Sequence, residues 1–269
     1  MGANKYEDAG ELFENAATKF KLAKNWARAE RAYSALHDCR TATKETHDAA
    51  SAIVESASMC KKMDDVAGAT TRLRRACELY AELGRLSQAA KHLKEIGELL
   101  EKEEDFEGAI AAYAQAADLY DGEESSSTTA NNCKLKVATL SAKLERYERA
   151  TEIFEDVARA SLENNLLRFS AKGYFLQAGM CRLCWNDPIG VLNAIERYEE
   201  SDPGFASSRE HELLRACAKA AENGDQEEFS QAVVEFDSMS RLDAWKTTIL
   251  LRAKKRIEKA VAEEEDDLT

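Results

Sequence analysis

The sequence predicts an all-α protein built from stacked antiparallel helix pairs, and three observations support this prediction. The 269 residues include only two prolines and twelve glycines, while alanine, glutamate, lysine, leucine and arginine dominate, a composition typical of helical proteins. One apolar pattern recurs along the chain at helical spacing. Its copies return with a period near 40 residues, which an ordinary helical bundle would not produce.

The recurring pattern is a large apolar residue, an alanine three positions later and a second large apolar residue four positions beyond that. Offsets of three and seven place all three side chains on one face of a helix. The small alanine in the middle lets two helices approach closely. The copies are Trp26–Ala29–Tyr33, Val66–Ala69–Leu73, Leu86–Ala89–Leu93, Phe106–Ala109–Tyr113, Tyr147–Ala150–Phe154 and Phe229–Ala232–Phe236.

The spacing of the copies indicates pairs of helices. Successive markers at Trp26, Val66, Phe106, Tyr147 and Trp185 are separated by 40, 40, 41 and 38 residues. An extra copy at Leu86 falls halfway through one period. A helical hairpin cannot bury its apolar face alone, so such hairpins stack. The predicted fold is therefore a right-handed superhelical solenoid of antiparallel helix hairpins. It is similar to the tetratricopeptide repeat but has longer helices.

Breaks in the pattern suggest where helices end. At the Trp185 copy, Pro188 replaces the alanine, which predicts a helix starting near Asp187–Pro188. The polar stretch GEESSSTTANN, residues 122–132, is predicted to be a long loop. Residues 201–204 are predicted to end another helix, and residues 223–225 to form a short turn.

The markers become irregular after Pro203, which suggests a change in packing. We therefore expect a tetratricopeptide-like solenoid over residues 1–200. A C-terminal helical-bundle cap packed on the solenoid is expected over residues 201–262, and an acidic tail over residues 263–269.

Charge and cysteine content restrict the class of partner and the compartment. The formal net charge of −13 argues against nucleic acid, because phosphate binding needs a basic surface. The N-terminal residues MGANKYEDAGELFENAA lack the apolar core of a signal peptide, and no stretch has the apolar length of a membrane span. The seven cysteines, an odd number, are then expected to be reduced and mostly buried. These features predict a cytoplasmic protein.

The sequence contains no motif typical of a catalytic site. Phosphate-binding glycine motifs are missing, and the four histidines have no metal-ligand spacing, so we expect no cofactor and no metal. Cys181 and Cys184 form a C-x-x-C, but no second pair of zinc ligands stands at a suitable distance. They also continue a helical run, SAKGYFLQAGMCRLCW, where a redox pair would begin a helix after a strand. We therefore favour the interpretation that Cys181 and Cys184 are buried core residues over the weaker one that they exchange thiols. We predict that the protein is not an enzyme.

The chain ends in EEEDDLT, five consecutive carboxylates followed by one leucine. An acidic run is usually a solvated chain end. The leucine allows a second interpretation, a docking peptide, because burying one leucine contributes about 1.5–3 kcal/mol. Both interpretations stay open on these residues alone.

Basic residues recur in successive predicted hairpins, where lysine and arginine near helix ends are also ordinary helix chemistry. Because corresponding positions of a solenoid align on one face, a basic stripe on a concave face would suit an elongated acidic partner. The residues concerned are Lys61, Lys62, Arg85, Lys91, Lys94, Lys134, Lys136, Arg168 and Lys172.

Several strings carry a resemblance to a known family. They are KLAKNWARAERAY, GRLSQAAKHLKEIGELLEKEEDFEGAIAAYAQAADLYDGEES, LLRFSAKGYFLQAGMC and EFDSMSRLDAWKTTILLRAKKRI, followed by the acidic DDL ending. The chain resembles the soluble NSF attachment proteins, most closely the alpha/beta type, from about Tyr6 to its end.

The resemblance implies a non-enzymatic adaptor in vesicle trafficking and membrane fusion. Its partners would be a four-helix SNARE complex of the syntaxin, SNAP-25 and synaptobrevin type, and the hexameric AAA ATPase NSF. The main SNARE-contacting lysine in the string A-A-K-H corresponds to Lys91, and a second family lysine is replaced here by Asn132. The other implied SNARE-binding positions are Lys61, Lys62, Arg85, Lys136, Arg168, Lys172 and Arg209.

The same resemblance places NSF binding on the C-terminal tail. The implied residues are Glu263, Glu264, Glu265, Asp266, Asp267 and Leu268, and Thr269 replaces a basic residue usual in the family. The family's N-terminal hydrophobic loop, which dips into membranes, has no counterpart in this chain. Weak autonomous lipid binding is therefore expected, with peripheral membrane association through SNAREs.

A different class of binder is the main alternative. A tetratricopeptide co-chaperone or scaffold clamps the C-terminal carboxylate of a short peptide. It would need Lys, Asn and Arg side chains that converge in one groove from adjacent repeats.

Overall fold

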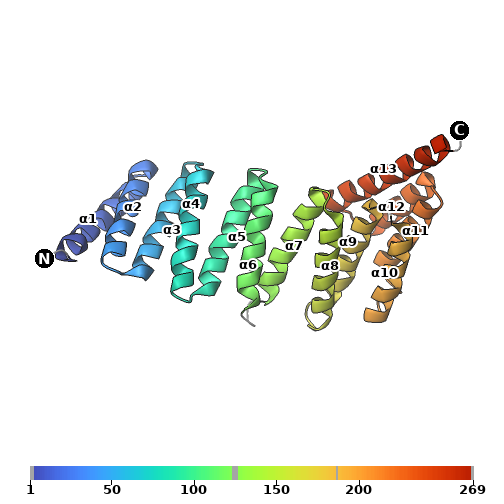
Figure 1. Cartoon of the computed structure of the whole chain (residues 1–269), viewed down its shortest axis with the longest axis horizontal. Helices are drawn as coiled ribbons and strands as arrows, with labels where there is room; N and C mark the ends of the chain where they lie inside the picture. The colour runs from blue at the N-terminus through green and yellow to red at the C-terminus, as the bar shows by residue number, and fades with distance from the viewer. Residues whose placement is uncertain (1–2, 123–126, 186, 268–269) are drawn as a thin grey trace. The chain divides into compact units, whose positions relative to one another are not determined.

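The computed structural model describes residues 3–122, 127–185 and 187–267, and these contain α-helices, one 3-10 helix and no strand. The predicted all-α class is therefore confirmed for the described part of the chain (Figure 1). The elements are α1 (Ala3–Leu22), α2 (Trp26–Ala42), α3 (Thr46–Lys62), α4 (Val66–Glu82), α5 (Leu86–Lys102), α6 (Phe106–Asp121), α7 (Ser127–Lys143), α8 (Tyr147–Leu162), η2 (Arg168–Ser170), α9 (Ala171–Cys184), α10 (Pro188–Ser201), α11 (Arg209–Glu222), α12 (Gln226–Met239) and α13 (Ala244–Asp267).

The chain divides into two compact units, residues 1–133 (unit 1) and residues 134–269 (unit 2), with the boundary inside α7. Each unit has its own packing and is described separately. The division expected from the sequence, at residues 200 and 262, stays a prediction.

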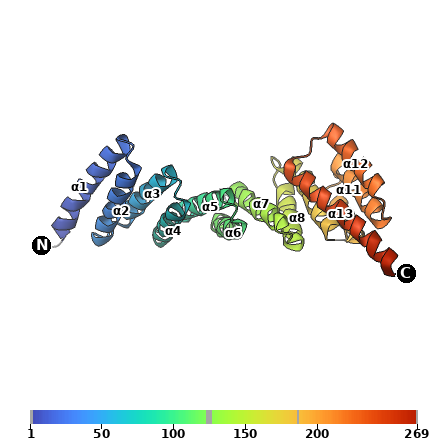
Figure 2. The same ribbon diagram turned by 90° about the horizontal axis from the view of Figure 1, so that it is seen from above.

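Unit 1 is a regular series of antiparallel helices in which each helix packs on the next, from α1 to α6 (Figures 1 and 2). The turns recur every 20 residues, each with one residue in the left-handed backbone region. The following N–H donates to the carbonyl five residues earlier, as in a Schellman motif. The left-handed residues are Lys24, Lys44, Asp64, Gly84 and Glu104, with φ between 54° and 69°. One helix and one turn thus take 20 residues, which explains the period of 40 in the sequence.

The repeat markers coincide with helix starts. Helices α2, α4, α5, α6 and α8 begin at marker residues, and the middle alanine of each of these copies is buried. Asn25, Asp65 and Asp105 precede three of these helices and accept hydrogen bonds from backbone N–H groups of the first turn, as N-cap residues do. Helix α10 begins at Pro188 with Asp187 as its N-cap, as predicted.

One prediction about the loops was wrong. Residues 122–132 were expected to form a long loop, but α7 already begins at Ser127, so residues 127–132 are helical. Residues 123–126 lie outside the described residues. The segment is polar in composition but has one apolar helix face. Ala130, Cys133 and Val137 stand at offsets of three and seven on that face, and all three are buried. Burial of that face extends the helix through Asn132. The predicted helix end at residues 201–204 and the turn at residues 223–225 are confirmed.

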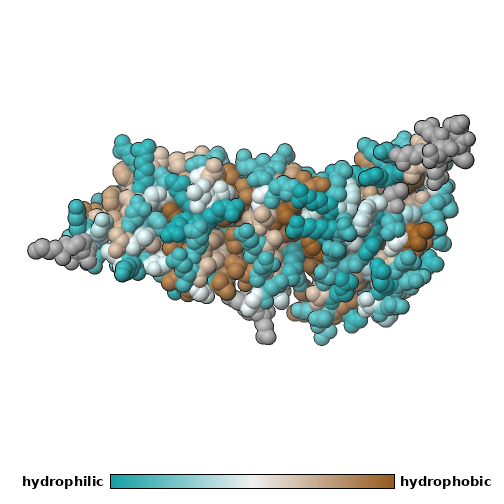
Figure 3. All heavy atoms as spheres, viewed as in Figure 1, coloured by the Kyte–Doolittle hydropathy of each residue, from teal (hydrophilic) through white to brown (hydrophobic). Residues whose placement is uncertain are grey.

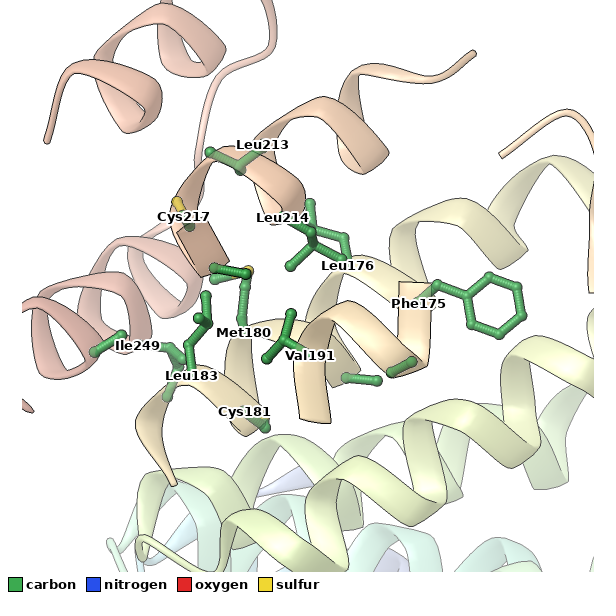
Figure 4. Close-up of a cluster of buried hydrophobic side chains, with 14 of the residues drawn as sticks. Phe175, Leu176, Met180, Cys181, Leu183, Val191, Leu213, Leu214, Cys217 and Ile249 are labelled. Atoms are coloured by element: carbon green, nitrogen blue, oxygen red, sulfur yellow. The ribbon is translucent and has the colours of Figure 1, made fainter. Parts of the chain in front are cut away.

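The core of unit 2 forms around α9, which contacts α8, α10, α11 and α13. Figure 4 shows Met180 and Leu183 of α9 among side chains from α10, α11 and α13. Because α9 contacts helices distant in sequence, this part does not follow the nearest-neighbour packing of unit 1.

The surface of the molecule is described by the hydropathy of its exposed residues. The face visible in Figure 3 is mostly hydrophilic, with hydrophobic residues in smaller patches. Among the described residues, no helix combines the length and the apolar character needed to cross a membrane.

Candidate partner-binding surface

In unit 1, helices α1 and α3 form the walls of a groove whose floor comes from α2. The groove has a volume of about 430 Å³. Lys21 of α1 and Glu55 of α3 close it with an ion pair of 2.6 Å. The lining residues are Glu14, Thr18, Lys21, Tyr33, Leu36, Arg40, Asp48, Ser51, Ala52 and Glu55.

The same cross-helix ion pair recurs 40 residues later, between Lys61 of α3 and Glu95 of α5. In each case the two partners are 34 residues apart in the sequence. By the same offset, Lys91 stands at the position that Ser51 occupies in the groove. Lys61, Lys91 and Glu95 are therefore placed on the grooved side of unit 1, at the junction of α3 and α5.

The predicted SNARE-binding cations of unit 1 differ in their exposure and in whether they are paired with a carboxylate. Lys62, Arg85 and Lys91 are exposed, and their side chains make no ion pair or hydrogen bond with another described residue. Lys61 is half-buried and paired with Glu95. Three of the four predicted SNARE-binding cations of unit 1 are thus available to a partner, while the charge of Lys61 is already balanced. Lys94, the other unit 1 cation of the predicted stripe, lies 3.8 Å from Glu98.

Glu95 is held in place by its neighbours. A hydrogen bond with His92 Nδ1 at 3.3 Å and the ion pair with Lys61 outweigh burial, and they hold the pKa of this carboxyl at about 2. His92 is itself buried and stacks on Tyr80, with ring centroids 5.7 Å apart. Glu95 therefore stays ionised at physiological pH.

In unit 2, predicted cations also bind groups of their own chain. Lys172 Nζ donates a 2.8 Å hydrogen bond to the carbonyl of Gly204, and Arg168 lies 3.9 Å from the carboxylate of the buried Asp202. Both side chains therefore fasten the α10–α11 connection to the start of α9. Arg209 at the start of α11 is exposed, and its Nη1 donates a 3.4 Å hydrogen bond to the carbonyl of Met239. Lys136 on α7 is exposed, and so is Asn132, which lies on the part of α7 that belongs to unit 1.

The connection between α8 and α9 contains two apolar residues that sequence reasoning missed. Leu166 and Phe169 are 89% and 86% exposed, beside Arg168. The loop is ordered by Asn164, whose side-chain oxygen accepts from the N–H of Leu166 at 2.9 Å and whose carbonyl accepts from the N–H of Arg168 at 2.9 Å. Large exposed hydrophobic side chains next to cations are typical of a protein-binding site.

The predicted ATPase-binding residues lie at the end of α13. This helix runs to Asp267, so the backbone of Glu263–Asp267 is helical. Leu268 and Thr269 lie outside the described residues.

The C-x-x-C pair lies in the core of unit 2. All seven cysteines are free and buried, which confirms the expected burial. Burial raises the pKa of Cys184 to about 12 and that of Cys181 well above its ordinary value. Since the thiolate is the reactive form, this environment disfavours thiol chemistry. No group of three or more His, Cys, Asp or Glu among the described residues could hold a metal ion.

Repeated helical hairpins define a tetratricopeptide-like repeat protein, a fold that presents extended surfaces for binding partners. The exposed cations lie on this fold. A crystal structure of a Signal Transduction ATPase with Numerous Domains (STAND) protein with a tetratricopeptide repeat sensor, from Pyrococcus horikoshii, has a similar fold. Its TM-score is 0.50 at 15% identity, over 89% of this chain and 38% of that chain.

The chain belongs to the soluble NSF attachment protein (SNAP) family, whose sequence profile matches residues 1–258. It is 46% identical over 266 residues to the alpha-soluble NSF attachment protein of Vitis vinifera, covering 99% of this chain and 91% of that protein. It is 38% identical over 269 residues to the probable vesicular-fusion protein sec17 homolog of Schizosaccharomyces pombe, covering 100% of this chain and 91% of that protein.

Proposed function

We propose that this protein is a non-enzymatic adaptor in vesicle trafficking and membrane fusion. It binds an assembled four-helix SNARE complex through the exposed cations and recruits and stimulates an NSF-type hexameric ATPase through its C-terminal end. The observation that carries this proposal is family membership over residues 1–258, with relatives named for NSF attachment and for vesicular fusion. The protein would act in the cytoplasm and reach membranes through SNAREs.

The exposed cations supply the attraction for the SNARE complex. Lys62, Arg85 and Lys91 project from unit 1 without a described intramolecular partner. Such charges steer and hold an acidic helical bundle, and the binding they produce weakens with salt. In unit 2, Lys136, Arg168, Lys172 and Arg209 add further positive charge, although Arg168, Lys172 and Arg209 also bind groups of their own chain.

Leu166 and Phe169 are expected to add an apolar contact to this charged surface. Changing both to serine should weaken binding to a soluble SNARE bundle about tenfold, because two exposed anchors lose the apolar area that they bury on binding. The melting temperature should hardly change, since both side chains are exposed in the free protein. The matched control is Ile189→Ser, at a residue of unit 2 that is 61% exposed. Equal losses in both variants would argue against a specific contact at the α8–α9 connection.

The C-terminal tail is expected to dock on the ATPase. Its acids would meet basic residues of the partner, and Leu268 would fill an apolar niche. The test measures ATP hydrolysis by NSF mixed with a soluble SNARE bundle and this protein. Leu268→Ala should weaken productive recruitment about ten- to a hundredfold, as expected for one buried leucine, while the neighbouring Thr269→Ala should keep stimulation.

Three outcomes separate the parts of this proposal. Stimulation by the parent and its loss in Leu268→Ala support both the adaptor function and the tail as a docking peptide. Stimulation by both proteins leaves the adaptor function but makes the tail a solvated end. If neither stimulates and the bundle is not bound, the adaptor function is wrong.

The carboxylate-clamp alternative fits the described groove of unit 1 less well. Glu14, Asp48 and Glu55 line that groove together with Lys21 and Arg40, and both cations are already paired with carboxylates. A peptide carboxylate would be repelled there.

A further inference from the structure

The carboxylate of Glu95 stands beside two of the predicted SNARE-binding cations of unit 1, Lys61 and Lys91. Glu95 forms an ion pair with Lys61 across the junction of α3 and α5, where the two side chains are 26% and 33% exposed. It also follows Lys91 by four residues on α5, so the two side chains project from the same face of that helix. Glu95 thus lies between a paired lysine and a free one.

We propose that Glu95 is an affinity-limiting residue of the SNARE-binding surface, an intramolecular competitor for the carboxylates of the partner. This inference rests on the proposed adaptor function. Glu95 already pairs with the ammonium group of Lys61, so a partner carboxylate that approaches Lys61 meets a balanced charge and a neighbouring negative one. It also places a negative charge beside Lys91, which reduces the positive potential that an acidic bundle meets.

The geometry opposes displacement of Glu95. Its second carboxylate oxygen lies 3.3 Å from His92 Nδ1, and His92 is held by stacking on Tyr80. The carboxyl is half-buried, where charge interactions are less screened than at a fully exposed site. Lys61 therefore serves mainly to pair with Glu95, and Lys62 and Lys91 are left to hold the partner.

The test is a double-mutant cycle on binding to a soluble four-helix SNARE bundle at low salt. Glu95→Gln keeps the shape of the side chain and removes its charge, and it should tighten binding about three- to tenfold. Lys61→Met in the parent should weaken binding by about twofold at most, because it removes a cation that was already paired and leaves the charge of Glu95 unpaired beside Lys91. In the Glu95→Gln background, the same Lys61→Met change should remove most of the gain.

The homologous ion pair one repeat earlier gives a matched control. Glu55→Gln changes the net charge by the same amount and breaks the Lys21–Glu55 pair, but Ser51 stands there in place of Lys91. It should therefore leave affinity nearly unchanged. Helical content and melting temperature of each variant show whether the fold is retained.

Four results would overturn the inference. They are unchanged affinity in Glu95→Gln, a gain that survives Lys61→Met, an equal gain in Glu55→Gln, and a parent that does not bind the bundle at all. The last result alone also refutes SNARE binding as the proposed function, whereas the first three leave that function intact.

Discussion

Replacing Trp245 with alanine is expected to lower the free energy of unfolding of unit 2 by about 3 kcal/mol, near the lower end of the range for removing a large aromatic side chain. Trp245 packs edge-on against Phe154, with ring centroids 5.6 Å apart, and Phe154 is fully buried. Its indole Nε1–H donates a 3.1 Å hydrogen bond to the carbonyl of Thr139. The substitution removes the aromatic contact and leaves that carbonyl without this donor.

The effect should concentrate on α13. Beyond Trp245, this helix is held by Arg252, whose guanidinium donates to the carbonyls of Ala142 and Lys143 at 3.0 and 3.2 Å. The buried side chains of Ile249, Leu250, Ala253 and Ile257 complete the contact. After Trp245→Ala, backbone amides of α13 should exchange with deuterium faster, and ATPase stimulation should fall, because α13 carries the predicted docking tail.

Denaturant unfolding of both proteins measures the loss, and Trp185→Ala is the matched control. Trp185 belongs to the same unit but is 46% exposed and has no described hydrogen bond from its indole. Its replacement should lower the free energy of unfolding by less than about 1 kcal/mol. Equal losses in the two variants would mean that Trp245 does not anchor α13 in particular.

The regular part of the fold could be predicted from the sequence because every second helix of unit 1 (α2, α4 and α6) begins with the same residue pattern. An apolar residue at the first helical position, a buried alanine and a capping Asn or Asp recur at one period, so the markers at Trp26, Val66 and Phe106 locate the helix starts. The left-handed turn residues could not be found in this way. Lys24, Lys44 and Glu104 adopt a conformation for which glycine is the usual signal.

The candidate site could be predicted only in part. Residue type identifies a cation, but whether its charge is free depends on neighbours from other helices, as Lys61 and Glu95 show across 34 residues. Exposed apolar residues were missed for a related reason. The string L-L-R-F resembles a core segment, and only the ordered loop around Asn164 shows that Leu166 and Phe169 project outward.

Reversing the charge at Lys91 is expected to weaken binding to the SNARE bundle about ten- to a hundredfold at low salt, since an attractive contact becomes a repulsive one. Lys91→Glu should not alter the fold, because the side chain is exposed and has no described partner. Titration of the bundle at several salt concentrations measures the effect. The difference from the parent should shrink as salt rises, because the Debye length falls from about 10 Å at 0.1 M to about 3 Å at 1 M.

Arg74→Glu provides the control for net charge. Arg74 is an exposed cation of α4 in the same unit, and it does not stand at any position equivalent to the residues of the groove. Its reversal changes the total charge as much as Lys91→Glu does, so a general electrostatic effect would weaken binding equally in both. A loss confined to Lys91→Glu would instead locate the contact at the junction of α3 and α5. Equal losses would mean that binding depends on the net charge of the whole protein. The grooved side of unit 1 would then not be a preferred binding site.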